Sequence, residues 1–278
     1  MPDHPLPHLF ERFEAEWFFD WIAGAPEPAR SVLATSAVRL GGGGIATSMA
    51  NDPVSYWSKA LGFERVVDRD TVAEIVDFYL DCGTPSATVQ VAPDLLPADW
   101  SDICAEFGLV SDSSWVKLSG SSDVRLDLPA GVRVGAVAPA DLDEWAAVVF
   151  RGFGMPTDLL PSIAVESAVR GVIEPFAAWV GPTLVGGASL AVVDGVGALL
   201  GASTLPEYRG RGAQSALIEV RARSARARGV DRLVVETGRP SVAGGNPSLN
   251  NLVRAGLRPV YDRANWQWTN PRFSTSAG

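Results

Sequence analysis

The hydrophobic residues near the start of the chain recur three or four positions apart, as they do along one face of an α-helix. Residues 6–23 carry this spacing, with acidic residues between the apolar ones. The apolar positions are Leu6, Leu9, Phe10, Phe13, Trp17 and Trp21. The pattern predicts an amphipathic helix over residues 6–23.

The rest of the first half alternates between strand-like and helix-like segments. A strand-like stretch at 31–40 leads through four glycines, Gly41–Gly44, to a second strand at 45–49. A glycine run can cradle a phosphate, but this one lacks the Lys-Ser/Thr pair of a P-loop and joins two strands, which favours a hairpin turn. Small polar residues at 121–130 indicate a linker. Helices are expected at 71–82 and 98–107, and further strands at 87–91 and 115–118.

The second half predicts a longer series of strands and helices. An uncharged stretch at 176–193 is long enough to cross a membrane as a helix. It is interrupted by Gly181-Pro182 and Gly186-Gly187, which are typical of turns between strands. We therefore expect strands here and no membrane span. The expected strands are 132–137, 176–180, 184–193, 196–204, 233–236 and 260–268, and the expected helices are 139–150, 162–173, 213–228 and 249–255.

One pattern occurs twice along the chain. In each half a helix-like segment ends at a glycine, and a strand, a loop, a second helix, a Gly-Leu pair and a strand containing tryptophan follow. The two glycines are Gly83 and Gly108 in the first copy, and Gly229 and Gly256 in the second. Such spacing predicts a duplicated unit. Together with the linker at 121–130, the repeat predicts two domains, at 1–120 and 131–278.

Composition narrows the classes of function. The chain has 278 residues, of which 47% are hydrophobic and 20% charged, so it can bury a core. Its net charge is −9, and the acidic excess lies in the first half, which is unfavourable for nucleic-acid binding. The acidic half either serves solubility or attracts a cationic partner or amine substrate.

Histidine and cysteine are scarce. The two histidines, His4 and His8, lie in the proline-rich start, and the two cysteines, Cys82 and Cys104, lie in helix-like segments. This excludes a disulfide framework and argues against a metal site or a histidine-based triad in the folded body. The start also lacks a basic region followed by an apolar one, so we expect no secretory signal and predict a cytoplasmic protein.

The loop between the strand at 196–204 and the helix at 213–228 carries the clearest chemistry. It reads Arg209-Gly210-Arg211-Gly212-Ala213-Gln214. Glycines let the backbone approach an anion closely, and the first turn of a helix offers unpaired N–H groups at the positive end of its dipole. The arginines add positive charge. The loop therefore predicts a diphosphate site, against the alternative of an ordinary turn with solvated arginines.

This loop resembles the signature Arg/Gln-x-x-Gly-x-Gly/Ala of the GNAT superfamily of acyl-CoA N-acyltransferases. Arg209 and Gly212 match the signature, and Gln214 stands where the family has a small residue. The order of elements over 131–270 is also similar to GNAT, whereas no such signature precedes the helix at 71–82. The resemblance implies an α+β fold of two GNAT-like units, each a mixed, mostly antiparallel sheet flanked by helices. It further implies that the first is a degenerate copy without a CoA site and that the second is the acetyltransferase domain.

The resemblance implies acetyl-CoA as the acyl donor, and the scarcity of histidine and cysteine predicts no metal. The pantetheine arm would pair with the backbone at the end of one strand, and the diphosphate would lie on the loop and the first turn of the helix. The residues implied for CoA are Ser203, Thr204, Leu205, Arg209, Gly210, Arg211, Gly212, Ala213, Gln214 and Ser215. Asn246 and Asn250 are candidates for bonds to the pantetheine amides, with helix capping as the alternative role.

The resemblance also implies a direct attack of an acceptor amine on the thioester, with backbone N–H groups stabilising the oxyanion. Many family members protonate the leaving thiolate with a tyrosine, but Leu252 stands at that position here. Tyr261 is a substitute candidate for this acid, and packing is its alternative role. Glu236 or Glu207 could accept the amine proton, directly or through water.

Phe153 and Met155 stand in the loop where the GNAT fold lines its acceptor pocket. We predict an acetyl-CoA-dependent N-acetyltransferase that modifies a primary amine of a small molecule or peptide and binds neither nucleic acid nor membrane. The alternative is a catalytically silent acyl-CoA binder that serves as a sensor or scaffold, and the missing tyrosine supports it. A third hypothesis is transfer of a longer or charged acyl group.

Overall fold

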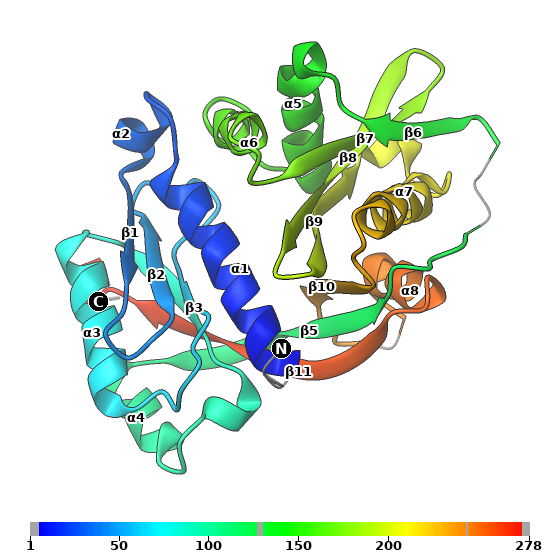
Figure 1. The fold of residues 1–278 in the computed structure, drawn as a ribbon. Coiled ribbons are helices and arrows are strands. Elements are labelled where there is room, and N and C mark those ends of the chain that lie inside the picture. Colours follow the sequence, from blue (N-terminus) through cyan, green and yellow to red (C-terminus); the bar gives the residue numbers. More distant parts are fainter. Residues whose placement is uncertain (1–5, 127–129, 243, 274–278) are drawn as a thin grey trace. The chain divides into compact units, whose positions relative to one another are not determined.

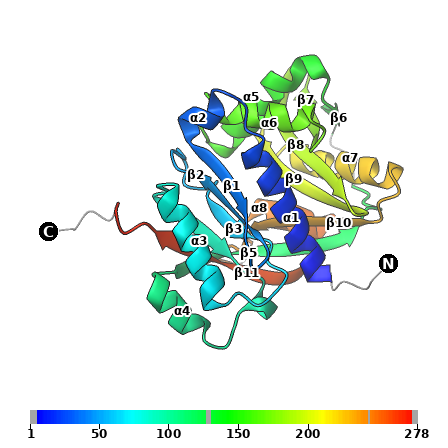
Figure 2. The same cartoon turned by 60° about the vertical axis from the view of Figure 1, so that its left-hand side comes forward.

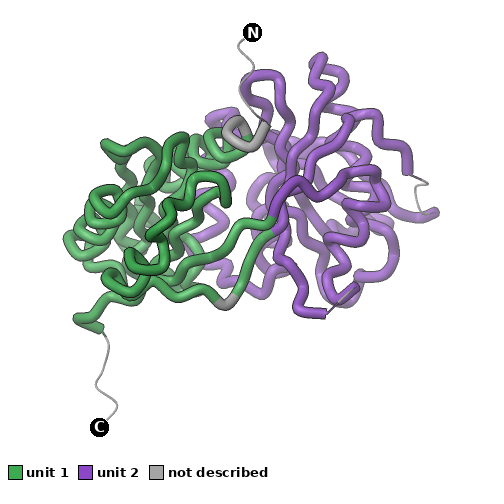
Figure 3. Tube along the Cα trace, turned by 90° about the horizontal axis from the view of Figure 1, so that it is seen from below, with its two compact units in different colours: residues 1–115, 262–278 green, residues 116–261 purple. Residues whose placement is uncertain are grey.

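The computed structural model describes residues 6–126, 130–242 and 244–273, so His4 lies outside the described residues. The chain forms two compact units, unit 1 with residues 1–115 and 262–278, and unit 2 with residues 116–261 (Figure 3). Strands β5 (Val110–Ser121) and β11 (Arg258–Thr269) are each divided between the two units, with one part of the strand in unit 1 and the other in unit 2. The segment 121–130, expected as a linker between domains, joins β5 to β6 within unit 2.

Unit 1 packs helices against a mixed sheet with strand order β1-β2-β3-β4-β11. The β1–β2, β2–β3 and β4–β11 pairs are antiparallel, and β3 and β4 are parallel. Helix α1 contacts β1, β2 and β3, and α3 contacts β2 (Figure 2). Its elements before β5 are α1 (Leu6–Ala23), α2 (Ala29–Leu33), β1 (Thr35–Arg39), β2 (Ile45–Met49), β3 (Lys59–Leu61), α3 (Arg69–Asp81), β4 (Ser86–Gln90), the 3-10 helix η1 (Pro93–Leu95) and α4 (Trp100–Phe107).

The predicted helix over 6–23 is confirmed as α1, and the glycine run forms a hairpin turn, since Arg39 pairs with Ile45 across it. The continuous strand expected at 31–40 is wrong. Its first part is helix α2, whose N–H groups turn back to the carbonyls of Pro26 and Pro28, and Ala34 ends the helix in a left-handed conformation. The sequence also gave no indication of the short strand β3.

A buried charged cluster fixes β11 in unit 1. Arg263 is fully buried, and its guanidinium contacts Glu11 at 2.6 Å and Glu14 at 2.8 Å, both on α1. It also donates to Gln90 on β4 at 3.1 Å. Removing one charge from such a cluster is costly, because it leaves the other charges buried without their partner. Arg263 therefore specifies which strand completes the sheet of unit 1.

Unit 2 is built around the strand order β11-β5-β10-β9-β8-β7-β6 (Figure 1). The β6–β7, β7–β8 and β8–β9 pairs are antiparallel, whereas β9 and β10 are parallel and connected through α7. Between β5 and β11 its elements are β6 (Val132–Ala136), η2 (Pro139–Asp141), α5 (Leu142–Phe153), α6 (Leu160–Val169), β7 (Glu174–Val180), β8 (Thr183–Val193), β9 (Val196–Thr204), η3 (Pro206–Tyr208), α7 (Ala213–Ala227), β10 (Arg232–Gly238) and α8 (Pro247–Arg254).

Helices α5 and α7 cover opposite faces of β8. A Cβ atom added at Gly187 would meet Trp145 of α5 at 2.6 Å, so this position faces α5. Its neighbour Ala188 is fully buried in the core cluster that includes Leu217 of α7. Consecutive strand residues point to opposite faces, so the two helices enclose the sheet from both sides.

Both units contain an antiparallel series of strands followed by one parallel step through a helix. The predicted α+β class, with mixed and mostly antiparallel strand pairing flanked by helices, is confirmed. Within the described parts of the chain, no helix has the length and hydropathy that a membrane span requires.

Candidate functional site

Strands β9 and β10 pair over their first three residues and then separate. They pair only where Val196–Ala198 lie beside Arg232–Val234. Beyond these residues β9 continues to Thr204 and β10 to Gly238 without pairing with each other. The facing main-chain groups are therefore available to pair with an extended ligand that enters between the strands.

A β-bulge lies on β9 beside this opening. Ser189 pairs with Leu200, and the next pair towards the loop is Gly187 with Ser203. Two residues of β9, Gly201 and Ala202, thus oppose one residue of β8, and Gly201 has a φ of 49°. A bulge of this kind leaves a residue unpaired and redirects the backbone.

The loop after β9 delivers the chain to the start of α7. Gly210 and Gly212 have φ values of 76° and 80°, which glycine adopts without the penalty that a Cβ atom would bring. Gly212 is the N-cap of α7 and supplies no side-chain cap. Within the described residues, the backbone N–H groups of Ala213, Gln214 and Ser215 make no hydrogen bond. Three donors and the positive end of a 15-residue helix dipole therefore face this loop.

The two arginines of the loop have different surroundings. Arg209 donates from Nε to the carbonyl of Thr204 at 3.2 Å and from Nη2 to the carbonyl of Gly152 at 2.8 Å. Its guanidinium thus fastens the end of β9 to the end of α5. Arg211 is exposed and lies 5.2 Å from the ring centre of Tyr208, so it is the arginine free to meet an anion.

Gln214 connects the first turn of α7 to α8. Its Nε2 donates to the hydroxyl of Ser248 at 2.9 Å, and its Oε1 accepts from Nδ2 of Asn251 at 2.6 Å. The bulk of this residue therefore points towards α8. Its backbone N–H remains among the three unused donors.

The residues at the end of β9 bind to the rest of unit 2. The Ser203 hydroxyl donates to the carbonyl of Val149 at 2.8 Å, and the Leu205 N–H donates to the carbonyl of Val185 at 2.9 Å. Thr204 pairs with Gly186 of β8. These three residues bind β8 and α5, so a ligand between β9 and β10 would meet β9 along its other edge.

Both candidate asparagines cap or brace α8. Asn246 accepts from the N–H groups of Ser248 and Leu249, and its Nδ2 donates to the hydroxyl of Thr237 at 3.0 Å and to the carbonyl of Gly238 at 2.7 Å. The side chain of Asn250 donates to the carbonyl of Gly244 at 3.0 Å. The side-chain amides of Asn246 and Asn250 are therefore both hydrogen-bonded within unit 2. Asn246 connects the end of β10 to the start of α8.

Glu236 lies on β10 just past the point where β9 and β10 part, and its carboxylate contacts Nζ of Lys117 at 2.9 Å. The two side chains are 17% and 6% exposed. The ion pair holds the carboxylate in position beside the opening between β9 and β10. The sequence analysis did not identify Lys117 as the partner of Glu236. Its place between the apolar residues Val116 and Leu118 of a strand was the available sign that this lysine is buried.

The structure does not bring Tyr261 to this carboxylate. Strand β5 lies between β10 and β11, so Tyr261 on β11 is displaced by two strand spacings, about 10 Å. Leu252 is 3% exposed and belongs to the core of unit 2. The position where a tyrosine acid is usual is thus filled by an apolar core side chain. Glu207 is exposed in η3.

Phe153 and Met155 lie where α5 ends, next to Gly152, whose carbonyl binds Arg209. Phe153 is 46% exposed, although it is a large apolar residue. The arrangement places both residues beside the start of the loop that leads to α7.

A second residue that sequence reasoning missed is Arg221 on α7, which is 1% exposed. Its Nη1 donates to the carbonyls of Ser189 and Leu200 at 3.1 and 3.2 Å, and its Nε donates to the carbonyl of Leu217 at 2.9 Å. Burial lowers the pKa of Arg221 to about 9, so the group keeps its charge at neutral pH. Its place on the apolar face of the helix, four residues after Leu217, could have revealed it.

The corresponding helix of unit 1 starts differently. Asp68 caps α3 by accepting from the N–H of Thr71, and Asp70 adds a second carboxylate to the first turn. The hydrogen bond from the Thr71 hydroxyl holds the pKa of Asp68 below its usual value. This helix start is negatively charged and already capped, which disfavours a phosphate.

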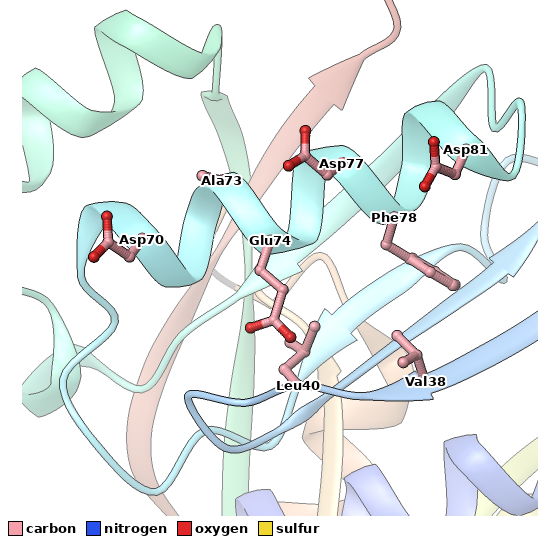
Figure 4. A pocket seen from close by; sticks show the side chains of 8 residues that line it. All are labelled: Val38, Leu40, Asp70, Ala73, Glu74, Asp77, Phe78 and Asp81. Carbon is pink, nitrogen blue, oxygen red and sulfur yellow. The ribbon is translucent and has the colours of Figure 1, made fainter.

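A pocket on unit 1 is lined by apolar and acidic side chains. Asp70, Glu74, Asp77 and Asp81 project from α3, and Glu74 points towards Leu40 (Figure 4). Glu74 accepts from the N–H of Gly41 at 2.9 Å. No group of three or more His, Cys, Asp or Glu residues within the described ranges could hold a metal ion. We assign this pocket no function.

Comparison with known proteins gives one family and a group of similar folds. The model of the acetyltransferase (GNAT) family matches residues 148–243, which contain the loop, α7, β9 and β10. A comparison with curated protein sequences gives no match.

Several solved structures share the fold at low sequence identity. A GCN5-related N-acetyltransferase from Sphaerobacter thermophilus is 14% identical with a TM-score of 0.60, over 76% of this chain and 72% of that chain. One from Kribbella flavida is 15% identical with a TM-score of 0.59, over 90% of this chain and 99% of that chain. A tandem GNAT protein from the clavulanic acid biosynthesis pathway is 15% identical with a TM-score of 0.57, over 93% and 94% of the two chains.

Proposed function

We propose that the part of the chain matched by the acetyltransferase (GNAT) family model, residues 148–243, belongs to a domain that transfers the acetyl group of acetyl-CoA to a primary amine of a small molecule or peptide. The observation that carries the proposal is the combination of two features of unit 2. The uncapped start of α7 offers three unused N–H donors, and β9 and β10 part directly beside it. Together they suit a ligand with a diphosphate and an extended amide arm.

The diphosphate would bind the backbone from Gly210 to Ser215, with Arg211 adding positive charge. The pantetheine arm would pair with the free edges of β9 and β10. This places the thioester near the bulge at Gly201, where a redirected backbone N–H can stabilise the oxyanion that forms when the amine attacks.

Proton transfer centres on Glu236. Its carboxylate lies past the point where the strands part and forms an ion pair with Lys117, and it would take the proton that the amine loses, directly or through water. Phe153 and Met155 would line the acceptor side. No tyrosine acid is needed, because a CoA thiolate can leave near neutral pH without one.

Unit 1 is proposed to be a degenerate copy that binds no CoA. Its α3 starts with Asp68 and Asp70, where α7 starts with glycines and free N–H groups. Calorimetric titration of the full chain with acetyl-CoA should give one site per chain. Two equivalent sites would contradict the proposal.

The decisive experiment measures release of free CoA thiol when the chain is incubated with acetyl-CoA and a panel of primary amines. Release above the rate without amine, together with an acetylated amine detected by mass spectrometry, supports transfer. Binding of acetyl-CoA with no release for any amine would favour the silent acyl-CoA binder. Absence of binding would reject both. A parallel panel of longer acyl-CoA donors determines the acyl length that the site accepts.

A further inference from the structure

Arg221 is a buried cation whose contacts in the described structure include no carboxylate. Its three hydrogen bonds all go to backbone carbonyls, those of Leu217, Ser189 and Leu200. A buried charge is costly unless hydrogen bonds compensate it, and an apolar side chain of similar length would avoid that cost. The carbonyls of Ser189 and Leu200 lie beside the bulge of β9, so Arg221 acts on the backbone there as well as packing in the core.

Ser189 and Leu200 face each other across β8 and β9, at the pair that borders the bulge. A single nitrogen, Nη1, lies within 3.2 Å of both carbonyl oxygens. The carbonyl of Leu200 therefore points to the side of β9 that faces β8. Arg221 holds the two strands together where the regular ladder is interrupted.

The direction of this carbonyl fixes the direction of the next N–H. In a trans peptide the C=O and N–H groups point opposite ways, and the only cis bond among the described residues is Glu27-Pro28. The N–H of Gly201 thus points away from β8 and towards the side of β10. The pairing of β9 with β10 has already ended at Ala198, and among the described residues no atom other than those of its chain neighbours lies within 4 Å of the place where a Cβ of Gly201 would be.

We infer that Arg221 is a positioning residue for acyl transfer: it holds the bulge and polarises the peptide between Leu200 and Gly201, so that the Gly201 N–H donates more strongly to the thioester oxygen. A hydrogen bond from a cation to a carbonyl strengthens the N–H of the same peptide, because hydrogen bonds in series polarise one another. The inference rests on the proposed function, which places the thioester at this bulge.

The test observes the thioester carbonyl directly and needs no acceptor. Acetyl-CoA labelled with ¹³C at the carbonyl is bound to the full chain, and its ¹³C resonance is compared with that of free acetyl-CoA. A strong donor withdraws electrons from the carbonyl carbon and moves the resonance downfield in the wild type. Arg221→Lys and Arg221→Met should bind acetyl-CoA within about threefold of the wild type, yet lose more than half of this displacement.

The control is Arg223→Met on the same helix, which removes an exposed arginine and should leave the displacement unchanged. Where the amine panel has yielded an acceptor, Arg221→Lys should lower kcat about tenfold or more with little change in KM, as weakening one oxyanion donor does. Thermal melting of each variant shows whether it is folded.

The remaining outcomes would contradict either the role inferred for Arg221 or the proposed function. A folded Arg221→Lys with the full displacement would overturn the inference, as would a wild type that binds acetyl-CoA without any displacement. Loss of cooperative melting in both variants would assign Arg221 to the core alone. A wild type that does not bind acetyl-CoA would reject the proposed function itself.

Discussion

Two glycines at opposite ends of α7 have the same backbone conformation but different surroundings. Gly212 precedes the helix with a φ of 80°, and Gly229 follows it with a φ of 74°. A side chain at either position is strained, so the strain can be separated from the chemistry of the loop. This makes the pair a matched test of the diphosphate site.

Gly212→Asp should lower the affinity for acetyl-CoA at least about 100-fold, because it places a negative charge against the diphosphate. Gly229→Asp should cost similar stability and leave the affinity within about threefold. Isothermal titration of both variants measures this. Equal affinities in the two folded variants would mean that the loop after β9 is not the diphosphate site.

Glu236 and Tyr261 are separated by strand β5, and this predicts unequal effects on the acetyl-transfer rate. Glu236→Gln should lower the rate about 100-fold, the usual effect of losing a general base, and Tyr261→Phe less than about tenfold. The double variant Lys117→Met/Glu236→Gln removes both charges of the ion pair and should recover stability but not rate. A rate restored in the double variant would assign Glu236 a structural role only.

The rate at saturating acetyl-CoA should keep rising above pH 8. Leu252 replaces the usual tyrosine acid, so no group whose deprotonation would slow the reaction stands at that position. An unperturbed alkyl amine titrates near pH 10, and the rate should follow its free-base fraction. A pH–rate profile checks this. A bell-shaped profile whose alkaline limb disappears in Tyr261→Phe would instead identify Tyr261 as the acid.

At the scale of elements, α8 is attached to β10 through one side chain. Asn246 makes four hydrogen bonds, two to the first N–H groups of α8 and two to the end of β10. Asn246→Ala should destabilise the protein by about 1–2 kcal/mol, since it removes a cap and leaves the Gly238 carbonyl without this donor. Asn250→Ala removes one bond and should stay within about 0.5 kcal/mol.

Urea unfolding followed by tryptophan fluorescence measures both asparagine variants. If Asn250→Ala instead weakens acetyl-CoA binding strongly while stability is unchanged, its amide serves the pantetheine arm rather than the loop at Gly244. The same measurement on Asn246→Ala shows whether α8 must be anchored for the cofactor to bind.

At the scale of the whole molecule, the first half of the chain supplies strand β5, of which residues from Val116 onward belong to unit 2. Val116 and Leu118 are fully buried in the core of unit 2, and Lys117 contacts Glu236. A fragment of residues 131–278 lacks all three. We expect it to show no cooperative melting and no acetyl-CoA binding.

A fragment of residues 110–278 retains β5 and serves as the matched comparison. It should melt cooperatively and bind acetyl-CoA, because it contains every strand of unit 2. If residues 131–278 alone bind acetyl-CoA as tightly as the full chain, β5 is dispensable and Lys117 plays no part in the site.

The sequence by itself determined the local structure and the loop of the site. Hydrophobic period and turn residues act over a few positions, so α1, the hairpin at Gly41–Gly44, the three strands β7–β9 and α7 could be predicted closely. The glycines before α7 indicated an anion site for the same reason, since the backbone conformation they allow is a property of the loop itself.

Only the tertiary structure decided which strands lie together and which charges meet. The sequence placed β11 directly after α8 in the second domain, but pairing inserts β5 beside β10 and moves Tyr261 away from Glu236. The pairing of Lys117 with Glu236 and the contact of Arg221 with the bulge join residues far apart in the chain. Local patterns carry no record of such contacts, because long-range pairing depends on the burial and hydrogen bonding of the whole unit.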